Sequence, residues 1–461
     1  MDKITIRNPS DNYKVIDTFD ATSFQEIDRK IIKAKKAFTV WSQTSLLERI
    51  SILNTFLEAC KNKKDEIARF ISLEMGMPLF VCKEVDVDLG LLHLEGYLKY
   101  AEQWLAPEVT YENEQEIHTL YYEPLGVIGA SIPWNYPFSN FIWAVGQHLV
   151  VGNTVVIKHS EHSVLVTKLL EEIILSIPKL SDCCQFIYGD GKTVGNYVMN
   201  SKLDMIWFTG STKTGHIVYQ VAAQKGIPAT LELGGSAPAI VMQDADIDMS
   251  VISIFLYRFI NSGQTCDGIK RLLVHESIFE SFVEMLKNYT QSKQVGSALQ
   301  QGTHIGPLVN EIQLERLEEQ VADAIDKGAK VILGGKRPQN LFGAYYEPTI
   351  LTNISFDMAV WQEEVFGPVL PVVPFSTVPE AIKLANDTQY GLGGYVYTQD
   401  QDIAMKISKS LQTGNVSVNN ASYVIPQNPF GGYKVAPGFG RIHGRFGLQN
   451  FCNLKLVSLK K

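Results

Sequence analysis

One thiol lies in a short loop of small polar residues, Asn261–Gly268, with the sequence NSGQTCDG. A nucleophilic cysteine needs an accessible, polar setting, because the reactive form is the thiolate. A lone cysteine, however, is more often an inert buried residue. Residue type and setting therefore make Cys266 a candidate nucleophile and leave a structural cysteine as the alternative.

Two other polar residues have settings that suit catalysis. Glu232 lies between two leucines and before a glycine pair, in LELGGS. An apolar setting raises the pKa of a carboxyl group and makes it a general base near neutrality. Asn135 lies in PWNYP, where an amide held in an irregular turn can donate to an oxyanion. The alternatives are an exposed glutamate at an element's end and an asparagine that closes an Asx turn.

Two glycine-containing turns are candidates for binding phosphate. Phe208–Gly215, FTGSTKTG, follows an expected strand and opens an expected helix, so backbone N–H groups and the helix dipole point at one site. Gly189–Gly195, GDGKTVG, is one residue longer than the dinucleotide fingerprint GxGxxG. Neither turn has the full fingerprint, so a tight turn without phosphate is the alternative for both.

The elements around these residues predict an α/β protein. Apolar strands alternate with helices between Gly126 and Met242, which indicates a parallel sheet covered on both faces. The expected strands are Val127–Ile132, Thr154–Lys158, Gln185–Tyr188, Met205–Phe208 and Ala239–Met242, with helices such as Ser163–Ile177 and Thr212–Gln224 between them. Such sheets bind ligands at the carboxyl ends of their strands.

The alternation resumes after Asp244 and predicts a second α/β domain. Its expected strands are Leu272–His275, Val331–Leu333, Val369–Val373, Gly394–Tyr397 and Val416–Val418. The first hundred residues are predicted to be helical, with capping boxes at Ser23 and Ser45. Residues 107–123 predict two strands around the turn ENEQE, and Cys452–Leu459 predicts a terminal strand. That last strand pairs either with a neighbouring subunit or within its own sheet.

Length and composition are those of a soluble globular protein. The chain has 461 residues, 45% hydrophobic and 20% charged, which suggests about three domains. A net charge of -8 argues weakly against nucleic acid or an anionic membrane as partner. Six scattered cysteines without ligand spacing predict reduced thiols in the cytoplasm and no metal site. We expect no signal peptide and no transmembrane span.

The order and identity of the motifs together resemble the aldehyde dehydrogenase superfamily. The matching runs, which extend over almost the whole chain in the family's order, are Gly126–Phe138, Gly152–Lys158, Phe208–Gly215, Leu231–Gly235, Gly263–Cys266, Glu363–Pro368 and Pro429–Gly432. The resemblance implies a Rossmann-type NAD-binding domain (1–106 and 124–233), an α/β catalytic domain (234–424) and a β oligomerisation arm. The arm comprises 107–123 and 425–461 and implies a homodimer or homotetramer.

The resemblance also implies residue roles. Cys266 attacks the aldehyde carbon, and Asn135 with the Cys266 backbone N–H forms the oxyanion hole. Hydride leaves to the nicotinamide, and Glu232 activates the water that hydrolyses the remaining thioester. The implied cofactor-binding residues are Ile132, Pro133, Trp134, Lys158, Glu161, Gly191, Gly195, Gly210, Ser211, Leu233, Glu364 and Phe366. Glu161 favours NAD over NADP, because a carboxylate accepts from ribose hydroxyls and repels a 2′-phosphate.

Asp267, directly after the nucleophile, departs from the family's usual residues. A nearby carboxylate raises the pKa of a thiol. Either Asp267 points away and caps a local turn, or it faces the pocket and favours polar or cationic aldehydes. Both orientations stay open at this point.

Two further segments bear on the substrate. Lys270-Arg271 and Phe446–Asn453 resemble the bacterial succinate semialdehyde dehydrogenase subset. Such enzymes need a cation for the substrate carboxylate, and Arg258 is a candidate by position. A surface or ion-paired arginine is the equal alternative for Arg258.

Two other functions are alternatives to the oxidation of an aldehyde to its acid. A CoA-acylating dehydrogenase does not need the water-activating Glu232, and a catalytically silent binding protein does not need Cys266, Glu232 and Asn135 together. The presence of these residues argues against both alternatives.

Overall fold

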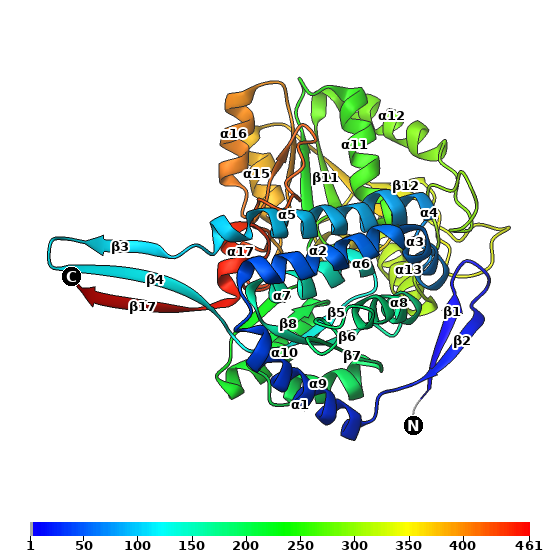
Figure 1. Ribbon diagram of the computed structural model, residues 1–461. Helices are drawn as coiled ribbons and strands as arrows, with labels where there is room; N and C mark the ends of the chain where they lie inside the picture. The colour runs from blue at the N-terminus through cyan, green and yellow to red at the C-terminus, as the bar shows by residue number, and fades with distance from the viewer. Residues whose placement is uncertain (1–2) are drawn as a thin grey trace.

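A five-stranded parallel sheet carries the turns that the sequence marks as cofactor sites. The computed structural model describes residues 3–461, so the first two residues of the predicted 1–106 segment lie outside it (Figure 1). The strand order is β7-β6-β5-β8-β9. Its strands are β5 (Val127–Ile132), β6 (Thr154–His159), β7 (Cys184–Ile187), β8 (Met205–Thr209) and β9 (Ala229–Glu232). The four expected strands of this sheet are confirmed, whereas β9 is an addition.

Helices cover both faces of this sheet, as the apolar strands predict. Inside β5 and β6, Val127 and Val156 pack on the face covered by α1 (Phe24–Trp41), whereas Ile128 and Val155 pack on the other face. The remaining helices of this half are α2 (Leu46–Asn62), α3 (Lys64–Met75), α4 (Leu79–Val81), η1 (Cys82–Val87), α5 (Asp88–Trp104), α6 (Pro137–Phe141), η2 (Ile142–Gly146), α7 (Gln147–Val151), α8 (Val164–Leu175), η3 (Gly191–Gly195), α9 (Asn196–Asn200) and α10 (Thr212–Lys225).

A second sheet of seven strands has the order β12-β13-β14-β11-β10-β15-β16. Its strands are β10 (Ala237–Val241), β11 (Ile269–His275), β12 (Lys330–Leu333), β13 (Thr349–Thr352), β14 (Val369–Phe375), β15 (Tyr395–Tyr397) and β16 (Ser417–Val418), and only β12–β13 pair antiparallel. The expected strand Ala239–Met242 therefore belongs to this sheet and not to the first. The helices around it are α11 (Ile247–Phe259), η4 (Ile260–Gly263), η5 (Glu276–Ile278), α12 (Phe279–Gln291), α13 (Glu311–Asp326), α14 (Ala359–Gln362), α15 (Val378–Asn386) and α16 (Gln401–Ser410). This α/β architecture confirms the predicted fold class, whereas the domain boundaries stay a prediction.

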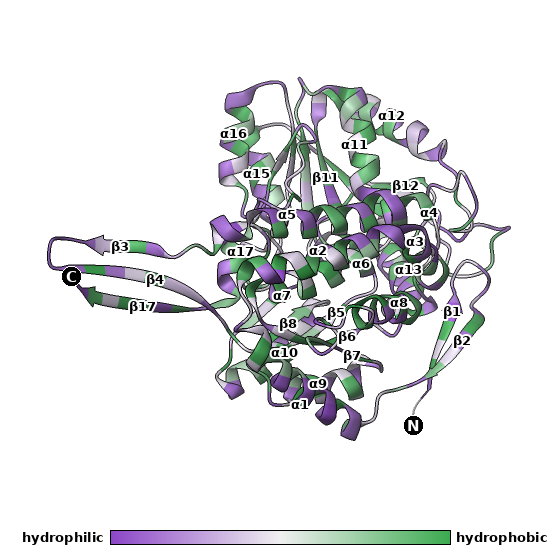
Figure 2. Cartoon of the chain, viewed as in Figure 1, coloured by the Kyte–Doolittle hydropathy of each residue, from purple (hydrophilic) through white to green (hydrophobic). Residues whose placement is uncertain are grey.

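Three antiparallel strands extend away from the body of the molecule (Figure 1). They are β3 (Glu108–Glu112), β4 (Glu116–Pro124) and β17 (Cys452–Lys460), the last reached through α17 (Gly444–Asn450). β17 pairs with β4 of the same chain along its whole length, so the terminal strand lies within its own sheet. Figure 2 shows hydrophobic residues on this arm. Leu454 and Leu456 of β17 are exposed.

The predicted all-helical start of the chain is wrong for residues 3–20. β1 (Lys3–Asn8) and β2 (Lys14–Asp20) form an antiparallel hairpin. Ile4 and Ile6 are buried whereas their neighbours are exposed, which is the period of two that a half-buried strand shows. The caps at Ser23 and Ser45 are confirmed, since each side chain accepts the N–H three residues on.

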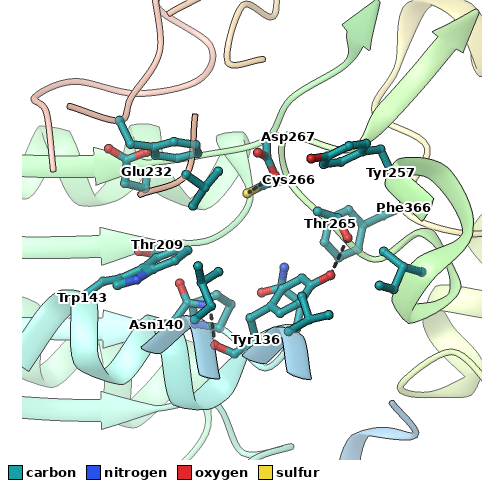
Figure 3. A pocket seen from close by; sticks show the side chains of 18 of the residues that line it. Tyr136, Asn140, Trp143, Thr209, Glu232, Tyr257, Thr265, Cys266, Asp267 and Phe366 are labelled. Carbon is teal, nitrogen blue, oxygen red and sulfur yellow. Dashed lines mark hydrogen bonds between the residues drawn. The ribbon is translucent and has the colours of Figure 1, made fainter. Parts of the chain in front are cut away.

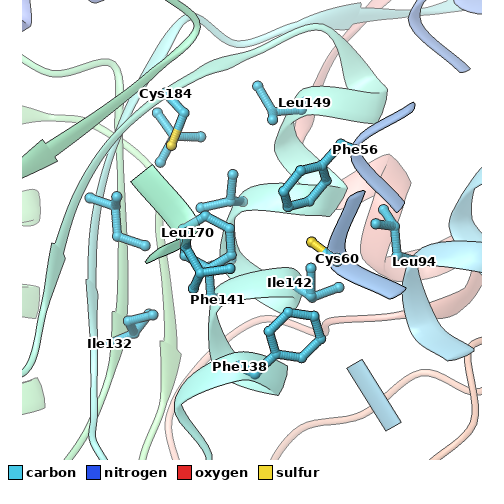
Figure 4. Close-up of a cluster of buried hydrophobic side chains, with 14 of the residues drawn as sticks. Phe56, Cys60, Leu94, Ile132, Phe138, Phe141, Ile142, Leu149, Leu170 and Cys184 are labelled. Atoms are coloured by element: carbon cyan, nitrogen blue, oxygen red, sulfur yellow. The ribbon is translucent and has the colours of Figure 1, made fainter. Parts of the chain in front are cut away.

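The segment that follows β5 is anchored in the largest hydrophobic core. Phe138 and Phe141 of α6 are fully buried and pack with Phe56 and its neighbours (Figure 4). The buried carboxylate of Asp86 also accepts the backbone N–H groups of Phe138 and Ser139, at 3.1 and 2.8 Å. Because Asn135 lies directly before α6, these contacts fix where its side chain stands. Within residues 3–461, no helix is long and apolar enough to cross a lipid bilayer.

We expect Asp86→Ala to lower the free energy of unfolding by about 2–4 kcal/mol, because two buried N–H groups lose their acceptor. Calorimetric unfolding measures the change. Asp65→Ala is the control, since Asp65 is exposed and only forms a surface ion pair with Lys83; its effect stays within about 0.5 kcal/mol. Equal effects of the two substitutions would contradict the anchoring role of Asp86.

Candidate active site

A cavity of about 720 Å³ is lined by residues from both halves of the chain. The sequence-predicted residues that it brings together are Asn135, Glu232, Cys266, Pro133, Trp134, Gly210, Ser211, Leu233, Glu364 and Phe366. Thr209 and Glu232 end β8 and β9, so this wall is the carboxyl edge of the first sheet, where parallel sheets bind ligands. Figure 3 shows the Cys266 and Glu232 side chains at this cavity.

The loop that carries Cys266 is held by its own polar side chains. Asn261 and Ser262 have left-handed backbone angles, φ 50° and 54°, which non-glycine residues seldom adopt without support. Ser262 donates to the Gly306 carbonyl at 2.7 Å, and the Gln264 carboxamide accepts the Val309 N–H at 3.0 Å. The motif therefore sets the backbone that presents the thiol.

Asn135 is tied to the same loop. Its buried side-chain amide donates to the Gln264 carbonyl at 3.1 Å, and its own carbonyl accepts from Asn261 at 2.7 Å. Next to it, the Tyr136 hydroxyl bonds to Thr265 Oγ1 at 2.9 Å (Figure 3). The amide is thus bonded to the thiol loop, and no acceptor among the described residues binds the second amide hydrogen of Asn135, which lines the cavity.

Glu232 is a buried carboxyl group without a hydrogen-bond partner among the described residues. Burial raises its pKa well above the usual range, Arg441 lowers it, and Asp267 raises it further. An unpaired buried carboxyl group costs stability, and perturbed groups of this kind gather at functional sites. This geometry suits a base that takes a proton from a molecule in the cavity.

Cys266 is half-buried, whereas the five other cysteines are buried. Burial raises the pKa of its thiol well above the usual value, Asp267 raises it further, and Lys270 lowers it. The Asp267 carboxylate lies 3.9 Å from Sγ and accepts the Tyr423 hydroxyl at 2.9 Å. Asp267 therefore faces the cavity, and the turn-capping alternative is wrong. A tyrosine 156 residues further along the chain holds it, which no local pattern reveals.

Five predicted cofactor residues lie outside this cavity lining: Ile132, Lys158, Glu161, Gly191 and Gly195. Ile132 is buried in the core. Lys158 lies near the end of β6 and Glu161 follows the strand. The two residues form an ion pair, with 3.0 Å between Nζ and Oε2. The carboxylate of Asp190 accepts a hydrogen bond of 2.6 Å from the Thr193 N–H. The turn Gly189–Gly195 therefore has one backbone N–H fewer to bind a phosphate.

The residues present fit an extended dinucleotide. The Lys158–Glu161 pair follows β6, and the Gly210-Ser211 turn follows the nearby β8 and lines the cavity that holds Cys266. Ser211 is the N-cap of the fourteen-residue helix α10, and the N-terminus of a helix favours an anionic ligand. A ligand that spans these positions reaches from β6 to the thiol.

Comparison with known proteins decides the family. The model of the aldehyde dehydrogenase family matches residues 1–457. The chain belongs to the aldehyde dehydrogenase family. It is 34% identical to the mitochondrial succinate-semialdehyde dehydrogenase of Oryza sativa over 459 residues, 99% of this chain and 86% of the relative.

Two further relatives agree with this assignment. The peroxisomal aminoaldehyde dehydrogenase 1 of Pisum sativum is 34% identical over 461 residues, 98% of this chain and 91% of the relative. An aldehyde dehydrogenase from Bacillus cereus, solved as an NAD+ complex, superposes with a TM-score of 0.95 at 29% identity, covering 100% of this chain and 93% of that one.

Arg258 does not serve this aldehyde dehydrogenase as a cation for the substrate, so that prediction is wrong. Its guanidinium is fully buried and donates to the carbonyls of Ile269, Val365 and Gly367. Arg271 is likewise buried against backbone carbonyls. These arginines join loops of the second sheet, because backbone carbonyls without a strand partner need buried donors.

Several cavity residues were not foreseen from the sequence. They are chiefly Glu84, Asp88, Trp143, Tyr257 and Tyr423. The only local signal was the spacing of four between Glu84 and Asp88, which places both on one helix face. The aromatic residues come from three distant segments and carry no shared motif.

We expect Asp267→Asn to lower the pKa of Cys266, because it removes a negative charge 3.9 Å from Sγ while keeping the shape. More thiolate forms at a given pH, so alkylation by uncharged iodoacetamide becomes about tenfold faster near neutrality. Rates measured across pH give the thiol midpoint, with Cys266→Ser as the blank. A midpoint that stays or rises would show that Asp267 carries no charge beside the thiol.

Proposed function

We propose that this aldehyde dehydrogenase oxidises an aldehyde to the carboxylic acid with NAD+ through a covalent thioester on Cys266. The observation that carries the proposal is the shared cavity: a thiol, a buried unpaired carboxyl group and a fixed amide face the same space. Family membership supports aldehyde chemistry, and the residues supply the steps.

In this proposal the Cys266 thiol first loses its proton to solvent. The thiolate Sγ then forms a bond to the aldehyde carbon, and the electron pair of the C=O π bond moves to the oxygen, which becomes an oxyanion. The free Asn135 N–H and the Cys266 backbone N–H donate to that oxygen, where charge develops. NAD+ held near Glu364 and Phe366 would supply the acceptor for the hydride that leaves this carbon. Glu232 then takes a proton from water, whose oxygen attacks the thioester, and the acid leaves as the C–S bond breaks.

The cofactor-binding residues predicted from the sequence would hold NAD+. Lys158 and Glu161 lie where the adenosine ribose would bind, Ser211 near the diphosphate, and Glu364 with Phe366 near the nicotinamide riboside. Glu161 favours NAD+ because its carboxylate repels a 2′-phosphate. Lys158 is already paired with this carboxylate, at 3.0 Å.

For the substrate we propose a neutral or cationic aldehyde. η1 and α5, which pack against the helices that follow Asn135, bring Glu84 and Asp88 to the cavity, where Asp88 is paired with Lys64 at 2.6 Å. Asp267 lines the same cavity beside the thiol. Among the described lining residues, Arg316 is the lone cation, and it lies 3.8 Å from Glu363 on the proposed cofactor side. A semialdehyde carboxylate therefore lacks a partner, whereas carboxylates and aromatic faces suit an ammonium group.

We expect Glu232→Gln to form about one equivalent of NADH per site in a rapid burst and then stop, because the thioester persists without its base. Rapid-mixing absorbance and intact mass measure the burst and the bound acyl group. Cys266→Ala, the matched control, gives neither. Steady turnover of Glu232→Gln would contradict the proposal, and turnover restored only by coenzyme A would support the acylating alternative.

We expect kcat/KM to fall about tenfold or more from an ω-aminoaldehyde to succinic semialdehyde of similar length, because the cavity field is negative. A neutral aldehyde ranks between them. Initial NADH rates with the three substrates measure the order. Glu84→Gln reduces the ratio of kcat/KM between the aminoaldehyde and the semialdehyde. Glu280→Gln, at an exposed position of α12, leaves that ratio unchanged. The highest value with succinic semialdehyde would overturn the charge argument.

A further inference from the structure

One buried ammonium group contacts three segments of the site. Lys270 is 1% exposed, and its Nζ donates to Glu364 Oε1 at 2.5 Å, the Gly235 carbonyl at 2.8 Å and the Cys266 carbonyl at 3.1 Å. All three ammonium hydrogens are thereby used. The Nζ also lies 5.2 Å from the centre of the Phe366 ring.

Glu364 depends on this ammonium for its place. Its Oε1 also accepts the Gly235 N–H at 3.0 Å, and the carboxylate packs so closely on Gly234 that a Cβ there would lie 2.2 Å from Oε2. A Cβ on Gly235 would likewise lie 2.3 Å from the carbonyl oxygen of Cys266. The glycine pair of the LELGG motif thus makes room for the carboxylate on one side and the nucleophile loop on the other.

We propose that Lys270 is a positioning residue that fixes Glu364 for the cofactor ribose and makes the Cys266 thiol easier to ionise. The inference rests on the proposed function for the role of Glu364. Neither the pattern of the nucleophile motif nor the predicted site residues include Lys270, which is four residues beyond the thiol.

The charges around the thiol give this proposal its direction. Asp267, Glu364 and Glu232 each oppose thiolate formation, and Lys270 is the group that favours it. Burial lowers the pKa of Lys270 below its usual value, and Glu364 raises it only in part. Buried Arg258 opposes that charge. Lys270 and Glu364 therefore act on Cys266 with opposite sign, although they form one ion pair.

Opposite signs allow a test that separates this role from a general loss of structure. Lys270→Met slows alkylation of Cys266 by iodoacetamide about tenfold near neutrality, and Glu364→Gln accelerates it about tenfold. Both single variants weaken NAD+ binding about tenfold or more, measured calorimetrically as Kd, because the ribose carboxylate is displaced or lost. Neither readout requires aldehyde turnover, so they stand even where the proposed oxidation fails.

The double variant Lys270→Met/Glu364→Gln brings alkylation back to within about threefold of wild type while NAD+ binding stays weak. Lys287→Met, a lysine ion-paired to Glu284 on the surface of α12, is the control and changes neither quantity. Alkylation that shifts in the same direction in both single variants overturns the proposal, as does an unchanged Kd for Lys270→Met. If Lys270→Met does not fold, Glu364→Gln decides: alkylation at or below the wild-type rate overturns it.

Discussion

The chemistry of this site depends on the scarcity of water around ionisable groups. Cys266 and Asp267 are half-buried beside the buried Glu232, and burial raises the pKa of each, which opposes formation of their charged forms. A nucleophile and a base are needed in their charged forms. Fixed positive charge must therefore be supplied inside the cavity wall, and Lys270 supplies it at a distance from the thiol that its backbone contacts set.

The rest of the fold keeps these charges in place. Two sheets bring Glu232 and the loop of Cys266 to one cavity, but a sheet alone does not hold a loop to a fraction of an ångström. Side-chain bonds to backbone do so here: Asn135 ties to the nucleophile loop, and Asp86 anchors the helix that follows it. The left-handed Asn261 and Ser262 persist because such bonds determine the loop around them.

The features that could be predicted from the sequence are those that depend on local patterns and on the order of the motifs. β5 to β8 agree with prediction within one residue, because runs of Val and Ile end sharply at turns. β9 was missed, since four residues after a proline show no period. The hairpin β1–β2 was missed as well, because its alternation covers only a few residues.

Long-range contacts set what the sequence could not predict. The orientation of Asp267 depends on Tyr423, and Arg258 became a structural residue through carbonyls more than 100 residues away. Residue type alone cannot separate a cation that meets substrate from one that meets backbone. Chemistry-bearing residues were found because their motifs occur in order, whereas the charges that tune them were found only once their neighbours were known.

The charge of the substrate and the ionisation of the thiol are linked through Asp267. Its carboxylate opposes the thiolate, so an anionic substrate brought to the same cavity adds to that cost, whereas a cationic group offsets it. Coulomb interactions between partly buried charges at about 4 Å amount to several kcal/mol, enough to outweigh a surface ion pair. An acid beside the nucleophile is therefore a handicap with anionic aldehydes and close to neutral with cationic ones, which is the physical basis of the proposed preference for neutral or cationic substrates.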